Sequence, residues 1–156
     1  MLQFDFLSNL PEAVPIVGRW YHQAWGHPQQ GESEESSIAG LEIYLNNDRI
    51  PFILVASEQK EILAAAQLKY REMADIFPEK EHWIGGLVVA PGHRGRGIAS
   101  RLVQEIMRIA PLYGVKTLYL QTEQLDGGLY ARLGWQAFQQ VNIKGLKVLV
   151  MQQKVG

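Results

Sequence analysis

Hydrophobic and polar positions alternate along the chain in a pattern that predicts seven β-strands. Leu2, Phe4 and Phe6 alternate with polar residues, as one face of a strand would. Other apolar runs are continuous, which is typical of strands that are buried on both faces. The predicted strands cover residues 2–6, 52–56, 62–70, 82–89, 117–122, 135–141 and 146–152. Gly85 and Gly86 interrupt the fourth strand and predict a bulge, or a place where another group approaches the backbone closely.

Four helices are predicted between these strands. The first begins at Pro11, where proline suits the start of a helix, and runs to residue 25. The second is capped by Ser33 and runs to residue 45, and the third covers residues 98–109, where Pro111 and Gly114 end it. Asp126 can cap a short fourth helix that runs to residue 133.

The order of these elements predicts the topology of the sheet. The third helix joins strand 82–89 to strand 117–122, so these two strands should be parallel, with a right-handed crossover. Short turns join strand 52–56 to strand 62–70 and strand 135–141 to strand 146–152, and they predict two antiparallel hairpins. We therefore predict an α/β (α+β) fold with a mixed, mostly antiparallel sheet of about seven strands, one central parallel pair and about four helices. The length predicts a single domain over residues 1–156.

Composition narrows the function classes. The chain has 156 residues, of which 47% are hydrophobic, and a formal net charge of -1. This near balance argues against a global basic surface for nucleic acid or for an anionic membrane. The absence of cysteine excludes disulfides, thiolate metal sites and a cysteine nucleophile, and it fits a reducing compartment. With no basic leader or long apolar run in the sequence, we expect a cytoplasmic protein.

The stretch "APGHRGRGIASRL", residues 90–102, crowds glycines and basic side chains between the fourth strand and the third helix. The start of a helix exposes unpaired N–H groups and carries partial positive charge, which together make an anion-binding cradle. Gly95 and Gly97 would allow left-handed turns without a side chain in the cradle, and Arg94 and Arg96 would add charged donors. The alternative is an ordinary loop with solvated arginines. The spacing matches neither a Walker A loop nor a dinucleotide fingerprint, since Ser100 stands where the fingerprint needs a third Gly or Ala.

This stretch resembles the acyl-CoA signature of the GNAT superfamily of N-acyltransferases, Arg/Gln-x-x-Gly-x-Gly/Ala. Arg94, Gly97 and Ala99 of "RGRGIA" match it. The neighbouring segments "WIGGLVV", "SRLVQEIMRIA", "TLYLQT" and "LYARLGW" agree with the superfamily in order and character, so the resemblance covers residues 83–135. It implies acetyl-CoA as co-substrate and an acyltransferase without a metal.

The resemblance also implies where the cofactor would lie. Backbone amides of residues 93–99 would hold the pyrophosphate, with Arg94 and Arg96 on either side, and strand 87–89 would pair with the pantetheine arm. An N–H near Leu87 or Val88 could polarise the thioester carbonyl. The residues expected at the cofactor are Leu87, Val88, Val89, Arg94, Gly95, Arg96, Gly97, Ile98, Ala99 and Ser100.

Three side chains are candidates for proton transfer. The resemblance places Tyr130 of "LYARLGW" where relatives often carry a tyrosine general acid, and the alternative is a packed aromatic residue. Glu81 and His82 stand at the start of the central strand, which often carries a base in relatives. Trp83 stands where some relatives carry a carboxylate. The alternative to a catalytic role, which the sequence favours equally, is that Glu81 is solvated and that His82 is half-buried and only hydrogen-bonded.

The acceptor site leaves further alternatives open. Trp20, Tyr21 and Trp25 could form its wall or belong to the core, and His22 and His27 have no partner at metal-ligand spacing. Acidic residues could attract a cationic amine or be solvated charges. These acidic residues are Glu32, Glu34, Glu35, Asp75 and Glu79.

Together these observations predict an N-acetyltransferase that transfers the acetyl group of acetyl-CoA to a primary amine by direct attack on the thioester. The expected partner is a small-molecule or peptide amine, and we expect the protein to bind neither nucleic acid nor a membrane. The sequence leaves open whether the chain forms a homodimer. A second hypothesis is a non-catalytic acyl-CoA-binding regulatory module with the same fold. A third is a nucleic-acid-binding domain that uses Arg94, Arg96 and Arg101, against which the near-neutral charge argues.

Overall fold

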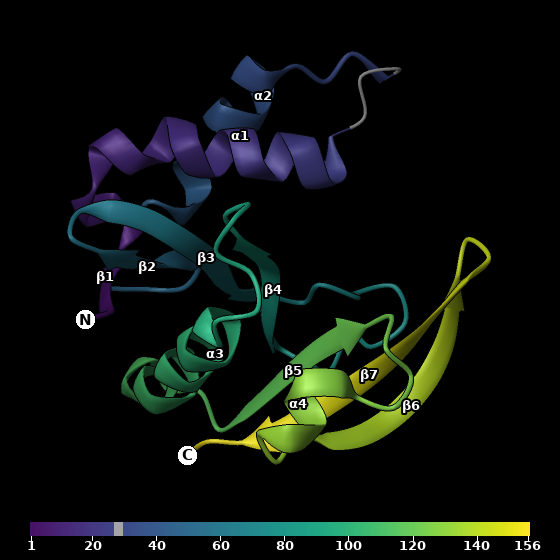
Figure 1. Cartoon of the computed structure of the whole chain (residues 1–156). Helices are drawn as coiled ribbons and strands as arrows, with labels where there is room; N and C mark the ends of the chain where they lie inside the picture. Colours follow the sequence, from purple (N-terminus) through teal and green to yellow (C-terminus); the bar gives the residue numbers. More distant parts are fainter. Residues whose placement is uncertain (27–29) are drawn as a thin grey trace.

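The computed structural model of the chain describes residues 1–26 and 30–156 and contains one seven-stranded sheet (Figure 1). The strands are β1 (Gln3–Phe6), β2 (Phe52–Glu58), β3 (Glu61–Tyr70), β4 (His82–Val89), β5 (Thr117–Thr122), β6 (Gln136–Ile143) and β7 (Leu146–Lys154). Their order in the sheet is β1-β2-β3-β4-β5-β7-β6, and β4 and β5 are its parallel pair. The predicted mixed sheet with a central parallel pair is therefore confirmed.

Four α-helices flank this sheet: α1 (Val14–Trp25), α2 (Glu34–Ala39), α3 (Ile98–Ile109) and α4 (Gly128–Arg132). Figure 1 shows α1 and α2 on one face of the β1–β4 half and α3 on the other, with α4 beside β5 and β7. Among the described residues, no helix is both long enough and apolar enough to cross a membrane.

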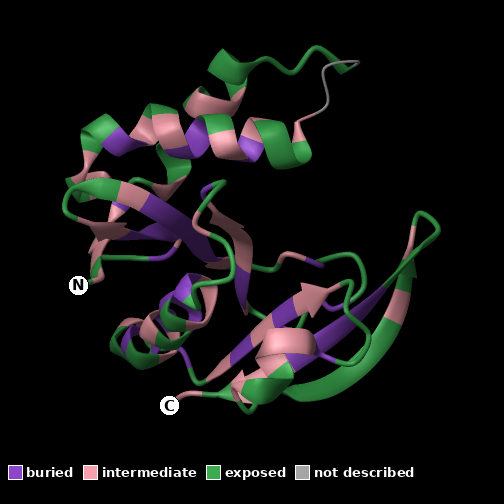
Figure 2. Cartoon of the chain, viewed as in Figure 1, coloured by how far each residue is buried: buried purple, intermediate pink, exposed green. Residues whose placement is uncertain are grey.

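Strands β2 and β3 are buried on both faces, which explains their continuous apolar runs in the sequence. In β2, Phe52 and Leu54 pack in the cluster that includes the apolar face of α3, whereas Ile53 and Val55 pack with Val17 of α1. Figure 2 shows this burial along the strands. Two apolar layers thus fix β3 and β4, the strands beside which the site lies.

β4 and β5 diverge soon after they meet. Their parallel register contains the pair Trp83↔Tyr119. The β3–β4 register shifts between Ala65 and Gln67, opposite the Gly85–Gly86 segment, so the predicted bulge is confirmed. The chain therefore opens the sheet at its centre, between two strands that are otherwise buried.

Several predicted boundaries differ from the structure. A 3-10 turn (Pro11–Ala13) precedes α1, because proline at this turn leaves α-helical hydrogen bonding to begin at Val14. The cap at Ser33 is confirmed, but α2 ends at Ala39 and continues as a 3-10 segment (Gly40–Tyr44), as glycine disfavours helix continuation. Trp135 lies before β6 and is buried in the core.

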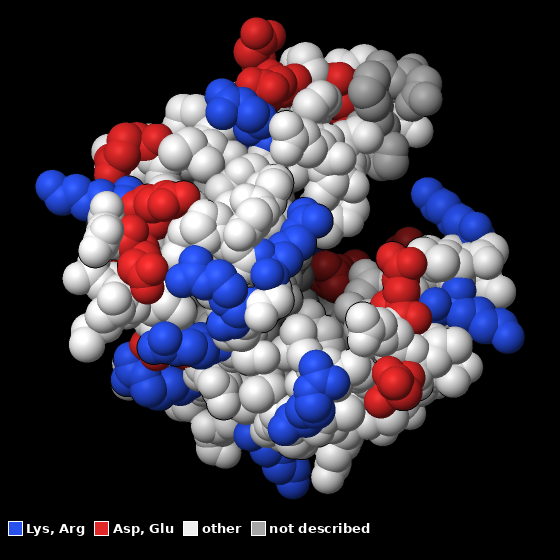
Figure 3. Space-filling view, viewed as in Figure 1, with Lys and Arg blue, Asp and Glu red and all other residues white. Residues whose placement is uncertain are grey.

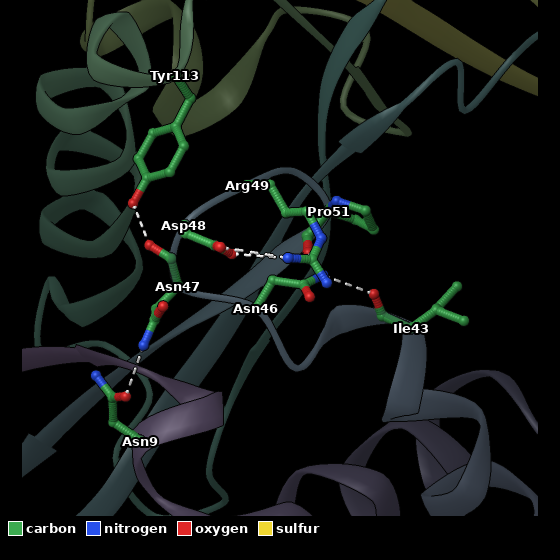
Figure 4. A network of polar contacts seen from close by, with 8 residues as sticks. All are labelled: Asn9, Ile43, Asn46, Asn47, Asp48, Arg49, Pro51 and Tyr113. Atoms are coloured by element: carbon green, nitrogen blue, oxygen red, sulfur yellow. Dashed lines mark hydrogen bonds and ion pairs between the residues drawn. The ribbon is translucent and has the colours of Figure 1, made fainter.

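Polar contacts fasten the loop between this 3-10 segment and β2 (Figure 4). Asn46 Nδ2 donates to the carbonyls of Ile43 and Pro51, at 2.9 and 2.7 Å. Asn47 Nδ2 donates to Asn9 Oδ1, and the Asn47 carbonyl accepts from Tyr113 Oη at 2.8 Å. The loop is thereby tied to Asn9, which precedes α1, and to Tyr113, which follows α3.

Candidate functional site

Backbone conformation builds the turn between β4 and α3. Gly92, Gly95 and Gly97 have positive φ values of 87°, 81° and 73°. A Cβ atom at Gly95 or Gly97 would meet no described atom within 4 Å, so these positions are left-handed without being crowded. Gly97 is the N-cap of α3 and no side chain caps the helix. The first N–H groups of α3, from Ile98 onwards, therefore remain available to an anion.

A cavity of about 650 Å³ lies over this turn. Among the residues predicted at the cofactor, the structure brings Leu87, Val88, Val89, Arg94, Gly95, Gly97, Ile98, Ala99 and Ser100 to its wall. Ala24, Trp25, His93, Gln124, Leu129 and Arg132 complete the lining. The wall thus combines an apolar strand edge, a helix start and two arginines, as a nucleotide with a long amide-bearing arm requires.

Arg96 is the predicted cofactor residue that does not line this cavity. Its guanidinium contacts His93 Nδ1 at 2.8 Å and donates to Glu58 Oε1 at 3.4 Å. His93 Nε2 in turn lies 2.9 Å from Glu61 Oε2. The N-terminal ammonium of Met1, followed by Arg96, holds the pKa of Glu58 below its usual range. The predicted clamp of two arginines is therefore reduced to Arg94 in this structure, because nearby carboxylates hold Arg96.

Polar side chains lie against the two glycines of the β4 bulge. A Cβ atom at Gly85 would lie 2.6 Å from Glu72 Oε1, and one at Gly86 would lie 2.6 Å from Gln67 Cδ and 2.9 Å from Tyr21 Oη. Gly86 also has a positive φ of 57°. Both glycines are therefore needed so that a carboxylate and an amide can lie directly against the strand.

A second cavity, of about 750 Å³, begins at this bulge. It is lined by Trp25, Gln67, Lys69, Glu72, Ile84, Gly85, Gly86, Leu87, Leu120, Gln121, Thr122, Glu123, Gln124, Tyr130, Leu146 and Val148. Trp25, Leu87 and Gln124 line both cavities, so the two spaces meet at the point where β4 and β5 diverge. Figure 3 shows a hollow on this face, with acidic atoms deep inside it.

Two carboxylates, Glu123 and Glu72, line the second cavity, and sequence reasoning missed both. Glu72 is the one that lies against the bulge. Its Oε1 lies 3.0 Å from Lys69 Nζ, and its Oε2 accepts from Gln121 Nε2 at 3.1 Å. The Glu72 side chain is only 16% exposed, so it is held in a fixed position. Glu72 stands two residues after β3, and only the fold shows that this loop start lies over Gly85.

Tyr130 of α4 lies on the wall of the same cavity. Burial raises the pKa of its hydroxyl, and the negative charge of Glu72 raises it further. The ring contacts Trp135 edge to face, at 6.2 Å between ring centroids. The hydroxyl therefore stays protonated near neutral pH, as a proton donor must.

Glu81 and His82, the predicted bases, line neither cavity. Glu81 is 52% exposed, and its Oε2 accepts from Arg71 at 3.4 Å. His82 packs against the ring of Tyr70, and burial lowers its pKa. The expectation that one of them faces the groove is wrong for this structure, because the start of β4 lies outside the part of the strand that borders the cavities.

The remaining acceptor-site candidates differ in whether they line a cavity. Trp25 borders both cavities, whereas Tyr21 is buried in the core and Trp20 packs against it. The five acidic residues of the predicted acidic mouth line neither cavity, and one of them, Glu34, pairs with Arg19. His22 lies 3.3 Å from Ser37 Oγ, and His27 is outside the described residues. Among residues 1–26 and 30–156, no group of three or more His, Asp or Glu side chains could hold a metal ion.

The site thus consists of a backbone cradle, an opened strand pair and a second cavity. A comparison of the sequence with protein families agrees with this architecture. The model of the acetyltransferase (GNAT) family matches residues 14–135, most of the chain. The chain belongs to the GNAT family of acetyltransferases. No curated protein matches it significantly.

Solved structures share this GNAT fold at low sequence identity. An aminoglycoside 6'-acetyltransferase type Ii is 20% identical, with a TM-score of 0.74 over 99% of this chain and 97% of that one. An aminoglycoside 6'-N-acetyltransferase complexed with coenzyme A is 16% identical, with a TM-score of 0.75 over 99% and 97%. The yncA protein of Salmonella typhimurium, solved with its cofactor acetyl-CoA, is 17% identical, with a TM-score of 0.76 over 99% and 94%.

Proposed function

We propose that the protein transfers the acetyl group of acetyl-CoA to the primary amine of a small polar molecule. The observation that carries this proposal is that the cavity over the β4–α3 turn meets a second cavity, lined by Glu72 and Tyr130, beside Leu87. The family and the acetyl-CoA and coenzyme A found in structures of the same fold support it. Two substrates bound in the two cavities would meet at the opened strand pair.

On the cofactor side, the N–H groups at the start of α3 and the side chain of Arg94 would hold the pyrophosphate. The edge of β4 at Leu87–Val89 would pair with the amides of the pantetheine arm, since β5 has already diverged from it. The N–H of Leu87 or Val88 would donate to the carbonyl oxygen as negative charge develops there. This fits the location of both residues on the wall of the cavity.

On the acceptor side, Glu72 would accept the proton that an ammonium ion must lose before its nitrogen can attack. The neutral nitrogen then forms a bond to the acetyl carbonyl carbon and loses a further proton to solvent, and the carbon–sulfur bond breaks as the carbonyl re-forms. Tyr130 would give its proton to the departing thiolate, and exchange with solvent would restore the hydroxyl. This assignment is supported by the positions of both side chains on the wall of one cavity.

The lining of the second cavity favours an acceptor that carries hydroxyl groups as well as an amine. Glu72 and Glu123 exceed the single positive charge of Lys69, so the cavity favours a cation. Gln121, Thr122 and other amide side chains offer hydrogen-bond donors and acceptors. The two neighbours that act on aminoglycosides, which are such molecules, support this acceptor class.

The test is thiol release from acetyl-CoA with a panel of benzylamine, tyramine, spermidine, glucosamine, lysine and kanamycin. We expect release above the amine-free rate with at least one amine, and highest with the amino sugars glucosamine or kanamycin. Acetylated product should be identified by mass spectrometry. Binding of coenzyme A with no turnover on any member would contradict the enzymatic proposal and favour a binding module.

A further inference from the structure

Lys69 of β3 carries a primary amine inside the second cavity. Its side chain is 22% exposed and lines this cavity together with Glu72 and Tyr130. The Nζ atom lies 3.0 Å from Glu72 Oε1. The acetyl transfer proposed above needs an ammonium ion within hydrogen-bond distance of Glu72, because this carboxylate would take its proton. The lysine amine thus occupies the position that the mechanism gives to an acceptor.

The glycine of the bulge brings this amine directly against β4. A Cβ atom at Gly85 would lie 2.8 Å from Lys69 Cε and 3.1 Å from its Nζ, so only a glycine leaves room for the end of the lysine. Leu87, where the two cavities meet, is two residues further along the chain, which is about 7 Å in an extended strand. The flexible four-carbon stem of lysine allows its amine to move over a distance of this order.

The position of Lys69 differs from that of every other lysine in the described part of the chain, because no other lysine lines either cavity. Gln121 Nε2 donates to the second oxygen of Glu72, so the carboxylate next to the lysine is fixed from its other side. Acetyl-CoA bound over the β4–α3 turn would therefore find one amine of the chain already inside the site, beside a fixed carboxylate.

We propose that the protein acetylates Lys69 Nζ with its own bound acetyl-CoA when no other acceptor fills the second cavity. The ammonium loses one proton to Glu72, and its nitrogen bonds to the acetyl carbonyl carbon and loses a second proton to solvent. The carbon–sulfur bond breaks as the carbonyl re-forms, and Tyr130 protonates the departing thiolate. Once solvent has restored Glu72 and Tyr130, each event yields one acetyl-lysine, one coenzyme A thiol and one released proton. The inference rests on the acetyl transfer proposed above and adds a modification site on the chain itself.

The modification would change the charge of the second cavity. An acetylated lysine is a neutral amide and can no longer pair with a carboxylate. Lys69 is the cation among the residues that line this cavity, and Glu72 and Glu123 are its two carboxylates. Acetylation therefore frees Glu72 Oε1 and leaves both carboxylates to a cationic acceptor.

The experiment incubates the purified protein with acetyl-CoA that carries a deuterium-labelled acetyl group, without any amine. Mass spectrometry of peptides then locates the label, and the isotope separates it from acetyl groups acquired during expression. Lys60, Lys116 and Lys144 are exposed and line neither cavity, so their labelling reports spontaneous acetylation. The rate is measured at several protein concentrations with saturating acetyl-CoA, because a reaction within one chain has a rate constant that does not depend on protein concentration.

We expect Lys69 to take up about one acetyl group, at least about tenfold faster than the exposed lysines, with a rate constant that does not change on dilution of the protein. Glu72→Gln should slow the labelling of Lys69 about 100-fold, and Glu81→Gln should not change it. Lys69→Arg should remove the fast label, because a guanidinium is not an acceptor for this chemistry. Lys116→Arg is the matched control, and it should retain the fast label at Lys69.

Labelling of Lys69 that is no faster than that of the exposed lysines, or that does not slow in Glu72→Gln, would overturn the inference. Turnover of a panel amine without label at Lys69 would overturn it as well, while leaving the proposed acetyl transfer in place. Absence of turnover with every panel amine would instead contradict that proposal, so the two failures are distinct.

Discussion

The cofactor side and the acceptor side of this site are built in different ways. On the cofactor side, contiguous backbone from β4 through the glycine turn to α3 provides the N–H groups, and most of the lining comes from residues 87–100. On the acceptor side, the lining residues come from α1, β3, the loop after β3, β4, β5, the loop after β5, α4 and β7. A binding site made of backbone survives changes of side chain, whereas one made of distant side chains can change its substrate without changing its fold. The following variants test this difference, from the largest expected effect to the smallest.

A Gly97→Glu substitution should break the cofactor side. It places a side chain and a negative charge at the N-cap of α3, in the open space that an anion would occupy. We expect coenzyme A affinity to fall by about 100-fold or more, measured by calorimetry. Gly145→Glu is the matched control, because Gly145 also has a positive φ and open space around it but lines neither cavity. Near-wild-type affinity in Gly97→Glu would exclude the cradle as the pyrophosphate site.

A Glu72→Gln substitution should break the acceptor side alone. The amide keeps the shape of the carboxylate but cannot take the proton of the ammonium, so kcat/KM for the amine should fall about 100- to 1,000-fold. Coenzyme A affinity should stay within about twofold, since Glu72 does not line the first cavity. Glu81→Gln is the control, and it should change kcat/KM by no more than about threefold, because Glu81 is exposed and paired with Arg71. The opposite ranking of these two variants would restore Glu81 as the base.

Tyr130→Phe should lower kcat about 10- to 100-fold, because the thiolate loses its proton donor while water in the cavity partly replaces it. The pH profile gives the sharper result. A raised pKa keeps the phenol protonated to higher pH, so activity that depends on it should persist below the ordinary tyrosine pKa of about 10 and decline only above it. This alkaline decline should be absent from the residual activity of Tyr130→Phe. A decline that is identical in both proteins would belong to another group.

The smallest effects should separate the two arginines of the turn. Arg94→Ala should weaken coenzyme A binding about tenfold, since its side chain borders the cavity. Arg96→Ala should weaken it by no more than about threefold, because Glu58 and His93 already hold that guanidinium. Equal losses in the two variants would mean that Arg96 leaves these partners when coenzyme A binds.

The same difference explains what the sequence could predict. The glycine turn, the parallel pair and the bulge follow from local patterns, because periodicity and glycine spacing act within a few residues. Nine of the ten predicted cofactor residues line the cavity over the turn. Arg96 does not line this cavity, and nothing in the sequence indicated this, because its partners Glu58 and Glu61, the latter acting through His93, are more than 30 residues away.

The acceptor side could not be predicted in this way. Glu72 follows a strand end, as many solvated acids do, and becomes a site residue only because the loop start lies over Gly85. Gln67 stands within an apolar strand and gives no signal until the fold brings its side chain to the wall of the second cavity. Trp25 is distinguished from its helix neighbours Trp20 and Tyr21 only by its location at the meeting point of the two cavities.

The most direct measurement is calorimetric titration of the purified protein with acetyl-CoA and coenzyme A, beside NAD and ATP. The backbone cradle and the β4 edge together predict saturable binding of both coenzyme A ligands with a stoichiometry near one, and much weaker binding of NAD and ATP, which lack the amide-bearing arm. No binding of coenzyme A by a folded sample, or equal binding of all four ligands, would contradict the assignment of this turn and the acetyl transfer built upon it.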